Sequence, residues 1–362
     1  MGARARLRDA LDRFEPPPRA VDWSLLLFVS AEVGTGLVSF TVGVPEGWPL
    51  FWLHRALGFA IVGLLVWKLA RVRRRLTDPS LWQRSTALSV LTLVAAVGAL
   101  STGILWVFGL DIRISYWTLL SVHVGFGLVL LLLVVAHAST RFRLPRRADF
   151  ERRRTVLRYT VLLGAGAAAY RLQQGVNELL DTAGSDRRFS GSQPREGDGN
   201  GAFPITSWVA DDPDPIDRES YRLQVDGLVA NPIELDAEEL AAGHETEALL
   251  DCTSGWYTVQ EWRGIRVSDL LDAAGEIDEE AAYVRFVSVT GYRWSLPLAE
   301  AEDALLATHV GEERLSHGHG APARLIAPGR RGFQWVKWVT HIEVRSEYDA
   351  GQWVVTLTSG FD

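Results

Sequence analysis

Four long apolar runs constrain this chain more than any other feature of its sequence. A bilayer core is crossed by about 20 mostly apolar residues in helical conformation, because a helix satisfies its own backbone hydrogen bonds within lipid. The four runs reach that length at residues 23–44, 51–70, 86–108 and 117–139. The sequence therefore predicts an all-α transmembrane helical bundle of four to five helices, which we bound at residues 20–172.

Basic residues indicate which ends of these runs face the cytoplasm. They cluster before the first run, after the second and after the fourth, whereas the loops after the first and third runs carry almost none. Because cytoplasmic loops are enriched in Lys and Arg, we expect a multi-pass protein of the cytoplasmic membrane with its N-terminus inside.

A fifth, shorter segment covers residues 152–170. The stretch from Arg153 to Arg158, RRTVLR, resembles a twin-arginine export signal: a pair of arginines, a gap, two apolar residues and a base. Alternatively, these arginines only extend the cytoplasmic basic flank. If the resemblance holds, the fifth helix ends outside the membrane, and the rest of the chain lies on the extracellular side.

Histidines within the runs suggest a haem, since polar groups inside a membrane are costly and usually functional. The runs that carry His54 and His123 both enter the membrane from the outer face. At the rise per residue of a helix, the two side chains lie at depths about 5 Å apart. Imidazoles on facing helices can ligate a haem iron from both sides, or they can simply hydrogen-bond across helices. We expect one haem b held by His54 and His123, in a pattern that resembles the small membrane cytochromes b.

A third histidine, His137, leaves the number of haems open. It lies 14 residues beyond His123, about 21 Å along the helix. The matching position on the second run is Lys68 rather than a second ligand. His137 is thus a quinone-pocket residue, an unusual ligand or a polar group at the membrane edge.

Charge divides the chain into two parts with different surroundings. The net charge of −7 combines a basic N-terminal part with a strongly acidic remainder. An acidic surface argues against nucleic acid as a partner, because a phosphate backbone needs a basic face. Lys68 and Lys337 are the only lysines, and an acidic, lysine-poor surface is typical of a halophilic protein.

Composition changes again after the bundle. Residues 173–202 are expected to form a flexible linker, since 182–202 consist largely of Gly, Ser and charged residues. Beyond it, residues 203–362 alternate predicted strands with helical spacing, which indicates an α+β domain. We expect strands at 221–229, 283–289, 323–327 and 333–344, and helices at 235–242, 267–274 and 299–309.

The acidic domain holds the only cysteine of the chain, Cys252, in the stretch LLDCTSGWYTVQEW. One cysteine cannot form an internal disulfide, so it is a buried filler, a reactive thiol or a metal ligand.

Several motifs around this cysteine match one family in order and spacing. They are FPITSW at 203–208, YRLQVDGLVANP at 221–232, the stretch 249–271 around Cys252, and HGAPARLIAPGRRGFQWVKWVTHIEV at 319–344. Together they resemble the molybdopterin domain of the sulfite oxidase family, over essentially all of residues 203–344.

The resemblance implies roles for individual residues. Cys252 would be the thiolate ligand of molybdenum, consistent with the preference of soft ligands for such a metal. Four cations would hold the pterin and its phosphate: Arg324, Arg330, Arg331 and Lys337. Gly329 and Gly332 would let backbone N–H groups approach that phosphate, and His319 would contact the cofactor or only shape its turn.

Aromatic residues are expected beside the metal, although each is equally well a core residue. They are Trp256 and Tyr257, which follow the cysteine, and Tyr292 on another strand. We treat Tyr257 and Tyr292 as candidate catalytic residues and Trp256 as a candidate cofactor contact.

The sequence also departs from the sulfite oxidases. Those enzymes follow the cysteine with glycine, asparagine and arginines, whereas Cys252 precedes Thr253-Ser254-Gly255-Trp256. The short stretch after Val344 also leads us to expect no C-terminal dimerisation domain. Both departures favour the periplasmic reductases of the family, such as the methionine sulfoxide reductase that works with a separate haem-containing membrane subunit.

We therefore predict a membrane-anchored, molybdenum-dependent oxidoreductase that reduces a small S- or N-oxide outside the membrane and exchanges electrons with the quinone pool through haem b. One alternative is a sulfite dehydrogenase, whose sulfur-oxyanion substrate would need further cations; Arg263, Arg266 and Arg293 are the candidates. Another is a non-enzymatic, membrane-tethered binding domain.

Overall fold

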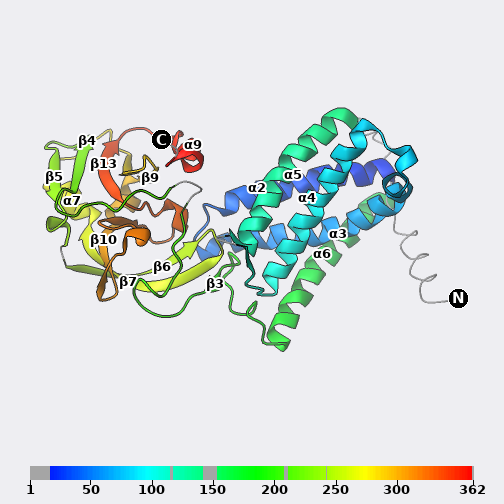
Figure 1. Cartoon of the computed structure of the whole chain (residues 1–362), viewed down its shortest axis with the longest axis horizontal. Helices are drawn as coiled ribbons and strands as arrows, with labels where there is room; N and C mark the ends of the chain where they lie inside the picture. Colours follow the sequence, from blue (N-terminus) through cyan, green and yellow to red (C-terminus); the bar gives the residue numbers. More distant parts are fainter. Residues whose placement is uncertain (1–16, 115–116, 142–152, 208–210, 242, 361–362) are drawn as a thin grey trace. The chain divides into compact units, whose positions relative to one another are not determined.

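The computed structural model describes residues 17–114, 117–141, 153–207, 211–241 and 243–360 (Figure 1). It divides into two units: a helical one up to Gln193, apart from Thr41–Val44, and a strand-rich one that comprises Thr41–Val44 and the chain from Pro194 onward. Each unit has its own cluster of buried apolar residues.

The helical unit confirms the predicted membrane bundle. Its long helices are α2 (Pro18–Ser39), α3 (Trp48–Thr77), α4 (Arg84–Val107), α5 (Leu119–Arg141) and α6 (Arg153–Leu179). Among the described residues, α2 to α5 are the helices long and apolar enough to cross a bilayer. The short elements between them are 3₁₀ turns at Pro45–Gly47 and Pro79–Leu81 and the strands β1 (Arg113–Ile114) and β2 (Trp117–Thr118).

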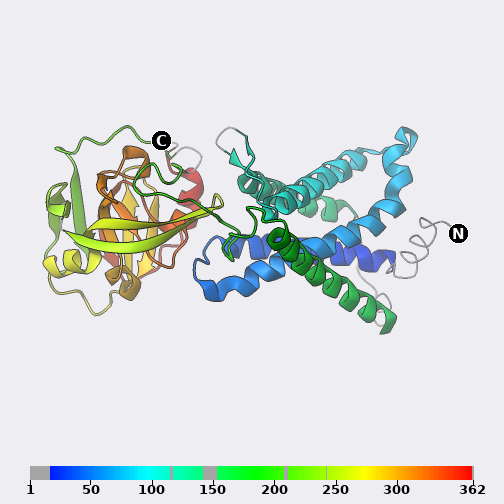
Figure 2. The ribbon, with the colours of Figure 1, turned by 90° about the horizontal axis from the view of Figure 1, so that it is seen from below.

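Pairwise packing holds these helices together, with α2 against α3, α4 against α5 and α3 against α6 (Figures 1 and 2). Small residues allow close approach, as expected where lipid supplies no hydrophobic drive between helices. A Cβ on Gly166 of α6 would lie only 2.5 Å from the carbonyl oxygen of Ala56 on α3.

The structure extends α6 well into the predicted linker. Near its end, buried Gln173 and Asn177 donate hydrogen bonds to the carbonyl oxygen of Val107, at 3.0 and 2.8 Å. Further along, Trp106 Nε1 donates to the carbonyl oxygen of Gly191 at 3.0 Å. The polar composition of this stretch thus serves the exposed carbonyls at the end of α4, where the sequence suggested a solvated tether.

The strand-rich unit contains two sheets, as the α+β prediction requires. In the described residues, the first sheet has the order β5-β4-β13-β8-β9, with β4 parallel to β13 and the other pairs antiparallel. Its strands are β4 (Arg222–Gly227), β5 (Ile233–Asp236), β8 (Tyr283–Ser288), β9 (Arg293–Pro297) and β13 (Val339–Arg345).

The second sheet carries a long antiparallel hairpin of β6 and β7, with β10 on the other side of β7. Its strands are β3 (Gln193–Pro194), β6 (His244–Cys252), β7 (Trp256–Arg266), β10 (Leu305–Val310), β11 (Glu313–Arg314) and β12 (Arg324–Ile326). The helices of the unit are α7 (Val267–Ala273), α8 (Leu298–Glu302) and α9 (Gln352–Thr358), with 3₁₀ turns at Glu239–Ala241, His317–His319 and Gly332–Gln334.

Most predicted elements of this unit exist, and two were assigned the wrong type. The helix predicted at 235–242 is the end of β5 followed by a 3₁₀ turn, and the one predicted at 299–309 is the short α8 followed by β10. Strand β10 is almost wholly buried, so its continuous apolar run could not be distinguished from a helix by periodicity. The strand predicted at 333–344 is confirmed only from Val339 onward.

Candidate functional site

Cys252 is the last residue of β6, at the turn that leads into β7. Gly255 adopts a left-handed φ of 95° and its N–H donates to the carbonyl oxygen of Cys252 at 3.0 Å, which closes the turn. The Cys252 sulfur lies 3.4 Å from Thr206 Oγ1 and 3.5 Å from the backbone N of Ser254. With Cys252 only 7% exposed, these two contacts hold its sulfur in one place.

The loop of Arg331 and Gly332 lies directly against the cysteine. A Cβ on Gly332 would stand 3.1 Å from Cys252 Cα, so no other residue fits here without displacement. Arg331 pairs with Asp251 at 3.1 Å and donates to the carbonyl oxygen of Cys252 at 3.3 Å. The Arg331 charge is therefore matched by a buried carboxylate, and the pair fastens this loop to β6.

Arg324 and Lys337 bring two further positive charges close to Cys252. Burial lowers the pKa of Arg324 to about 10, partly opposed by the negative charge of Cys252. The pKa of Lys337 falls to about 7 through burial and then through Arg324, opposed by Asp211 and Cys252. Lys337 Nζ donates to the carbonyl oxygens of Thr206 and Gly318 at 2.7 and 2.6 Å.

Unpartnered buried donors indicate that these residues suit an anionic group. In the described part of the chain, Arg324 Nε and Trp256 Nε1 are buried and have no hydrogen-bond partner. An unmade bond of a buried donor costs about 1–3 kcal/mol, and a buried cation costs more unless it is paired. A cofactor with a phosphate and a dithiolene would satisfy both needs, so the residues fit a molybdopterin with Cys252 as the protein ligand.

His319 is fixed by its own hydrogen bonds. Its Nε2 lies 3.2 Å from the carbonyl oxygen of Phe203, which can only accept, so Nε2 carries the proton and Nδ1 accepts from Ser316 Oγ at 2.8 Å. Burial, Arg324 and Lys337 lower the pKa of His319 to about 4. His319 is therefore neutral, and its contacts support the role of shaping the turn.

The structure also places three further predicted residues, Arg330, Tyr292 and Tyr257. Arg330 makes a bidentate ion pair with Glu300 of α8, with both nitrogen–oxygen distances at 2.7 Å, so its charge is used at the surface. Tyr292 is buried and its hydroxyl donates to the carbonyl oxygen of Phe333 at 2.5 Å, next to Gly332. Tyr257 follows Trp256 on β7 and is half-buried.

Two residues of this site were not anticipated from the sequence. Thr206 contacts both the Cys252 sulfur and Lys337, and Asp211 is a buried carboxylate whose pKa is raised by burial and opposed by Lys337. Thr206 belongs to the FPITSW motif, which is a usable signal, whereas Asp211 stands in an acidic run that resembles solvated surface.

In the helical unit, the rings of His54 on α3 and His123 on α5 face each other. Their centroids are 6.1 Å apart and their planes meet at 89°. Two metal–nitrogen bonds of about 2 Å each, plus the distance from each nitrogen to its ring centre, account for a separation close to this value. The two rings thus have the spacing that ligation of one iron would require.

The Nδ1 atom of each ring already has a partner. His54 Nδ1 lies 2.8 Å from Glu32 Oε2 and 3.0 Å from Thr35 Oγ1, and His123 Nδ1 lies 2.8 Å from the carbonyl oxygen of Ala99. Metal-binding histidines are oriented in this way, with one nitrogen hydrogen-bonded and the other left for the metal. Glu32 was not predicted, although a carboxylate inside a membrane span is itself a signal.

Lys68, at the position on α3 that matches His137, has a partner of its own, and the role of His137 stays open. Lys68 forms an ion pair with Asp22 at 2.7 Å, which Arg71 shares at 2.6 Å. His137 lies on α5, 14 residues beyond His123. Lys68 is thus accounted for by an acidic partner.

Comparison with protein-family models gives one match. Residues 210–353 match the model described as the oxidoreductase molybdopterin binding domain. The match contains Cys252 and the cations of the site from Arg324 to Lys337, and it lies wholly within the strand-rich unit.

Comparison with curated proteins gives relatives of the same kind. The chain is 32% identical over 169 residues to the uncharacterized oxidoreductase YuiH of Bacillus subtilis, covering 45% of this chain and 84% of the relative. It is 30% identical over 155 residues to the protein-methionine-sulfoxide reductase catalytic subunit MsrP of Gluconobacter oxydans (37% and 49%). It is 29% identical over 179 residues to the mitochondrial sulfite oxidase of Rattus norvegicus (40% and 33%). The chain thus spans less than two thirds of the length of this reductase subunit and of the sulfite oxidase.

Proposed function

The chain belongs to the oxidoreductases with a molybdopterin-binding domain, and from this premise we propose that it is a membrane-anchored enzyme that reduces a small S- or N-oxide by oxygen-atom transfer. The observation that carries the proposal is the position of Cys252, whose sulfur is fixed beside the buried Arg324, the partly buried Lys337 and two unpartnered buried donors, Arg324 Nε and Trp256 Nε1.

The proposed roles follow from these contacts. Cys252 would ligate molybdenum, and Arg324, Lys337 and Trp256 would hold the pterin and its phosphate. Arg331 and Gly332 would keep the cysteine strand and the adjacent loop in register. When bound, the cofactor supplies two-electron oxygen-atom transfer. The overall reaction consumes the oxide, two electrons and two protons, and it releases the reduced substrate and water.

A haem b between His54 and His123 is the proposed route for the electrons. The spacing and orientation of the two rings, and the partners of both Nδ1 atoms, support this assignment. Haem iron held there supplies single-electron transfer, and a membrane quinol is the proposed donor. The basic flanks of the spans support a strand-rich unit outside the cytoplasmic membrane.

Reduction of an oxide is favoured over oxidation of sulfite because the extra cations for an oxyanion are not at Cys252. Arg293 pairs with Asp349 at 2.6 Å. Arg263 and Arg266 lie seven and ten residues beyond Trp256 on β7, about 23 and 33 Å along an extended strand. The position of these three arginines therefore supports a neutral oxide as the substrate.

The proposal is tested with the purified full-length protein. Reduced viologen is supplied as electron donor, and its oxidation is followed with methionine sulfoxide, with trimethylamine N-oxide and, in the opposite direction with ferricyanide, with sulfite. Turnover with an oxide and at most trace turnover with sulfite is the expected result. Efficient sulfite oxidation without oxide reduction would contradict the proposal and identify the chain as a sulfite dehydrogenase.

A further inference from the structure

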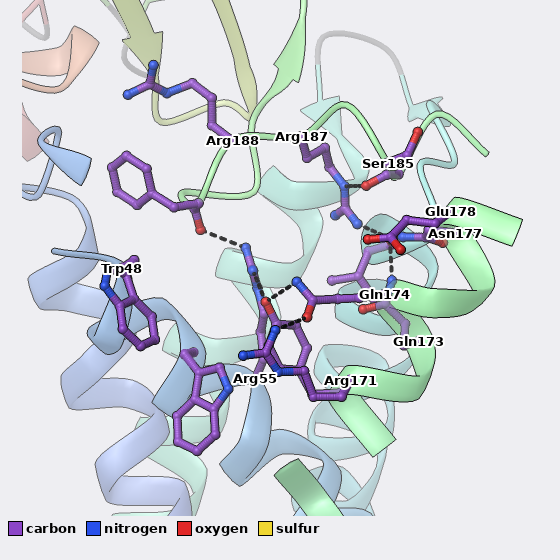
Figure 3. Close-up of a pocket in the computed structure, with 15 residues that line it drawn as sticks. Trp48, Arg55, Arg171, Gln173, Gln174, Asn177, Glu178, Ser185, Arg187 and Arg188 are labelled. Atoms are coloured by element: carbon purple, nitrogen blue, oxygen red, sulfur yellow. Dashed lines mark hydrogen bonds between the residues drawn. The ribbon is translucent and has the colours of Figure 1, made fainter. Parts of the chain in front are cut away.

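A cavity of about 290 Å³ lies at one end of the helical unit, and its lining contains neither of the two proposed haem ligands, although Arg55 directly follows His54 in the chain. Residues from the start of α3, the end of α4, the end of α6 and the segment 184–189 line it (Figure 3). Gln173 and Asn177 of α6 contact Val107 at the end of α4, and residues at the start of α3 line the same cavity, so these helix ends lie together. Since α3 and α4 are long and apolar enough to cross a bilayer, we infer that the cavity lies at the depth of the membrane–water interface.

Positive charge dominates the lining of this cavity. Arg55, Arg171, Arg187 and Arg188 line it, against the single carboxylate of Glu178. Like charges at close range repel, so a bound anion would stabilise this arrangement.

Neutral groups hold two of these arginines in place. Arg55 donates to Tyr170 Oη and to the carbonyl oxygen of Phe189, both at 2.9 Å, and Arg187 donates to the carbonyl oxygens of Trp106 and Val107. Burial and the nearby charge of Arg55 lower the pKa of Arg187 to about 9. Within the described residues, the partners of Arg55 and Arg187 are thus carbonyl and hydroxyl oxygens, which position the guanidinium groups without neutralising them.

Hydrogen bonds join Arg55 to Arg171 across the cavity. Gln174 Nε2 and Arg55 both donate to Tyr170 Oη at 2.9 Å, and Arg171 Nη1 donates to Gln174 Oε1 at 3.2 Å. Figure 3 shows the side chains of Arg55, Arg171 and Gln174 gathered in this way. Two cations are therefore held near each other on a prebuilt scaffold, which suits the several oxygens of one phosphate group.

We propose that this cavity binds the phosphate headgroup of an anionic phospholipid, a role beyond the oxidoreductase function proposed above. A lipid is favoured because paired guanidinium groups bind phosphate oxygens and the cavity lies beside helices apolar enough to adjoin acyl chains. Apolar surface for acyl chains flanks it: Trp48 of the lining is 54% exposed, and Leu172, beside Arg171 on α6, is 70% exposed. Trp is typical of this interfacial level.

Native mass spectrometry of the full-length protein in detergent tests the proposal, with phosphatidylglycerol or phosphatidylcholine added. The wild type should retain phosphatidylglycerol at least about tenfold better than phosphatidylcholine. Arg171→Gln and Arg55→Gln should each reduce that retention several-fold, and Arg55→Lys should keep most of it. Arg113→Gln is the matched control, because Arg113 is on the same face, pairs with Asp111 at 3.6 Å and does not line the cavity.

Equal retention of both lipids, or an equal loss in Arg113→Gln and Arg171→Gln, would overturn the proposal. A second measurement distinguishes a lipid headgroup from free phosphate. The thermal unfolding midpoint of the protein, in detergent with phosphatidylcholine, is compared with and without added inorganic phosphate. If inorganic phosphate raises this midpoint as much as phosphatidylglycerol does, the cavity is a site for free phosphate and the lipid assignment is overturned. No rise with inorganic phosphate, alongside a rise with phosphatidylglycerol, supports it.

Discussion

The two units of this chain differ in how many large apolar side chains they leave exposed. In the strand-rich unit, most large apolar side chains are inside, and Trp262, Trp335 and Phe286 are almost completely buried. In the helical unit, many are turned outward, with Leu132 at 72% and Leu27 at 65% exposure, although Leu64 is fully buried beside small residues such as Ala60. The difference follows from the solvent, since lipid tails are as apolar as leucine and only packing and polar contacts distinguish the interior.

Both units nevertheless solve the same problem of keeping polar groups inside. The strand-rich unit compensates Arg331 with Asp251 and leaves Arg324 with an unpartnered Nε for a ligand. The helical unit compensates His54 with Glu32 and His123 with a backbone carbonyl. At each proposed metal position, buried polar groups are thus largely matched by partners, as expected where burial of such groups is costly.

Cys252→Ser should have the largest effect, because it removes the protein ligand proposed for molybdenum. Oxide reduction with reduced viologen should fall more than about 100-fold, beyond the loss typical of residues that merely support a metal ligand. Elemental analysis should show that molybdenum is lost, or the absorption spectrum of the molybdenum site should change, while the haem absorbance stays intact. Thr253→Ser serves as the control one residue away. Unchanged turnover in Cys252→Ser would return this cysteine to an ordinary core residue.

His123→Ala should remove the haem of the helical unit and leave the strand-rich unit active. The haem absorbance should disappear, and quinol-driven oxide reduction should fall at least about tenfold, because the iron loses a ligand. Viologen-driven turnover, which delivers electrons directly to the strand-rich unit, should fall by less than a factor of two. His137→Ala is the comparison variant. If it removes the haem while His123→Ala does not, the proposed ligand pair is wrong.

Arg331→Met should destabilise the strand-rich unit by about 3–5 kcal/mol, since it leaves Asp251 buried without a partner. The double variant Asp251→Asn with Arg331→Met should recover much of that loss. Hydrogen exchange of the β6 and β7 amides, measured by mass spectrometry on the full-length protein, reports this unit separately. An effect confined to the helical unit, or no recovery in the double variant, would contradict the pairing.

The smallest predicted effect concerns pH. Burial lowers the pKa of Lys337 from 10.5 to about 7, so between these values the unfolded chain binds the additional proton. The free energy of unfolding of cofactor-free protein should therefore rise with pH from about 7 to 10, by roughly 1–3 kcal/mol. Lys337→Met should lose that rise, measured by urea unfolding at several pH values. If the free energy of unfolding of the wild type instead falls from pH 7 to 10, while that of Lys337→Met does not, the lowered pKa assigned to Lys337 is wrong.

The sequence predicted the membrane unit well because lipid imposes length and composition directly. The four apolar runs matched α2 to α5. The rings of His54 and His123 lie 6.1 Å apart, while their role as haem ligands stays a prediction. The extension of α6 was not predicted, because Gln173 and Asn177 look like linker residues until the carbonyl of Val107 is placed beside them. Such a contact joins residues about 70 positions apart, which no local pattern encodes.

In the strand-rich unit, motifs located the cysteine and its cations, and tertiary contacts decided what each cation does. The sequence treats Arg324, Arg330 and Arg331 alike. The structure pairs Arg330 with Glu300 and Arg331 with Asp251, and leaves Arg324 with an unpartnered donor. Secondary structure failed at 299–309 for a related reason, since burial of β10 on both faces removes the alternation that marks a strand.

The central claim is that one chain carries electrons from a haem in its helical unit to an oxide at Cys252. Stopped-flow absorbance of the purified protein tests it most directly: the haem is reduced first, and methionine sulfoxide is then added without any other acceptor. The account predicts reoxidation of the haem in the wild type and a haem that stays reduced in Cys252→Ser. A haem that stays reduced in both, or is reoxidised equally in both, would contradict it.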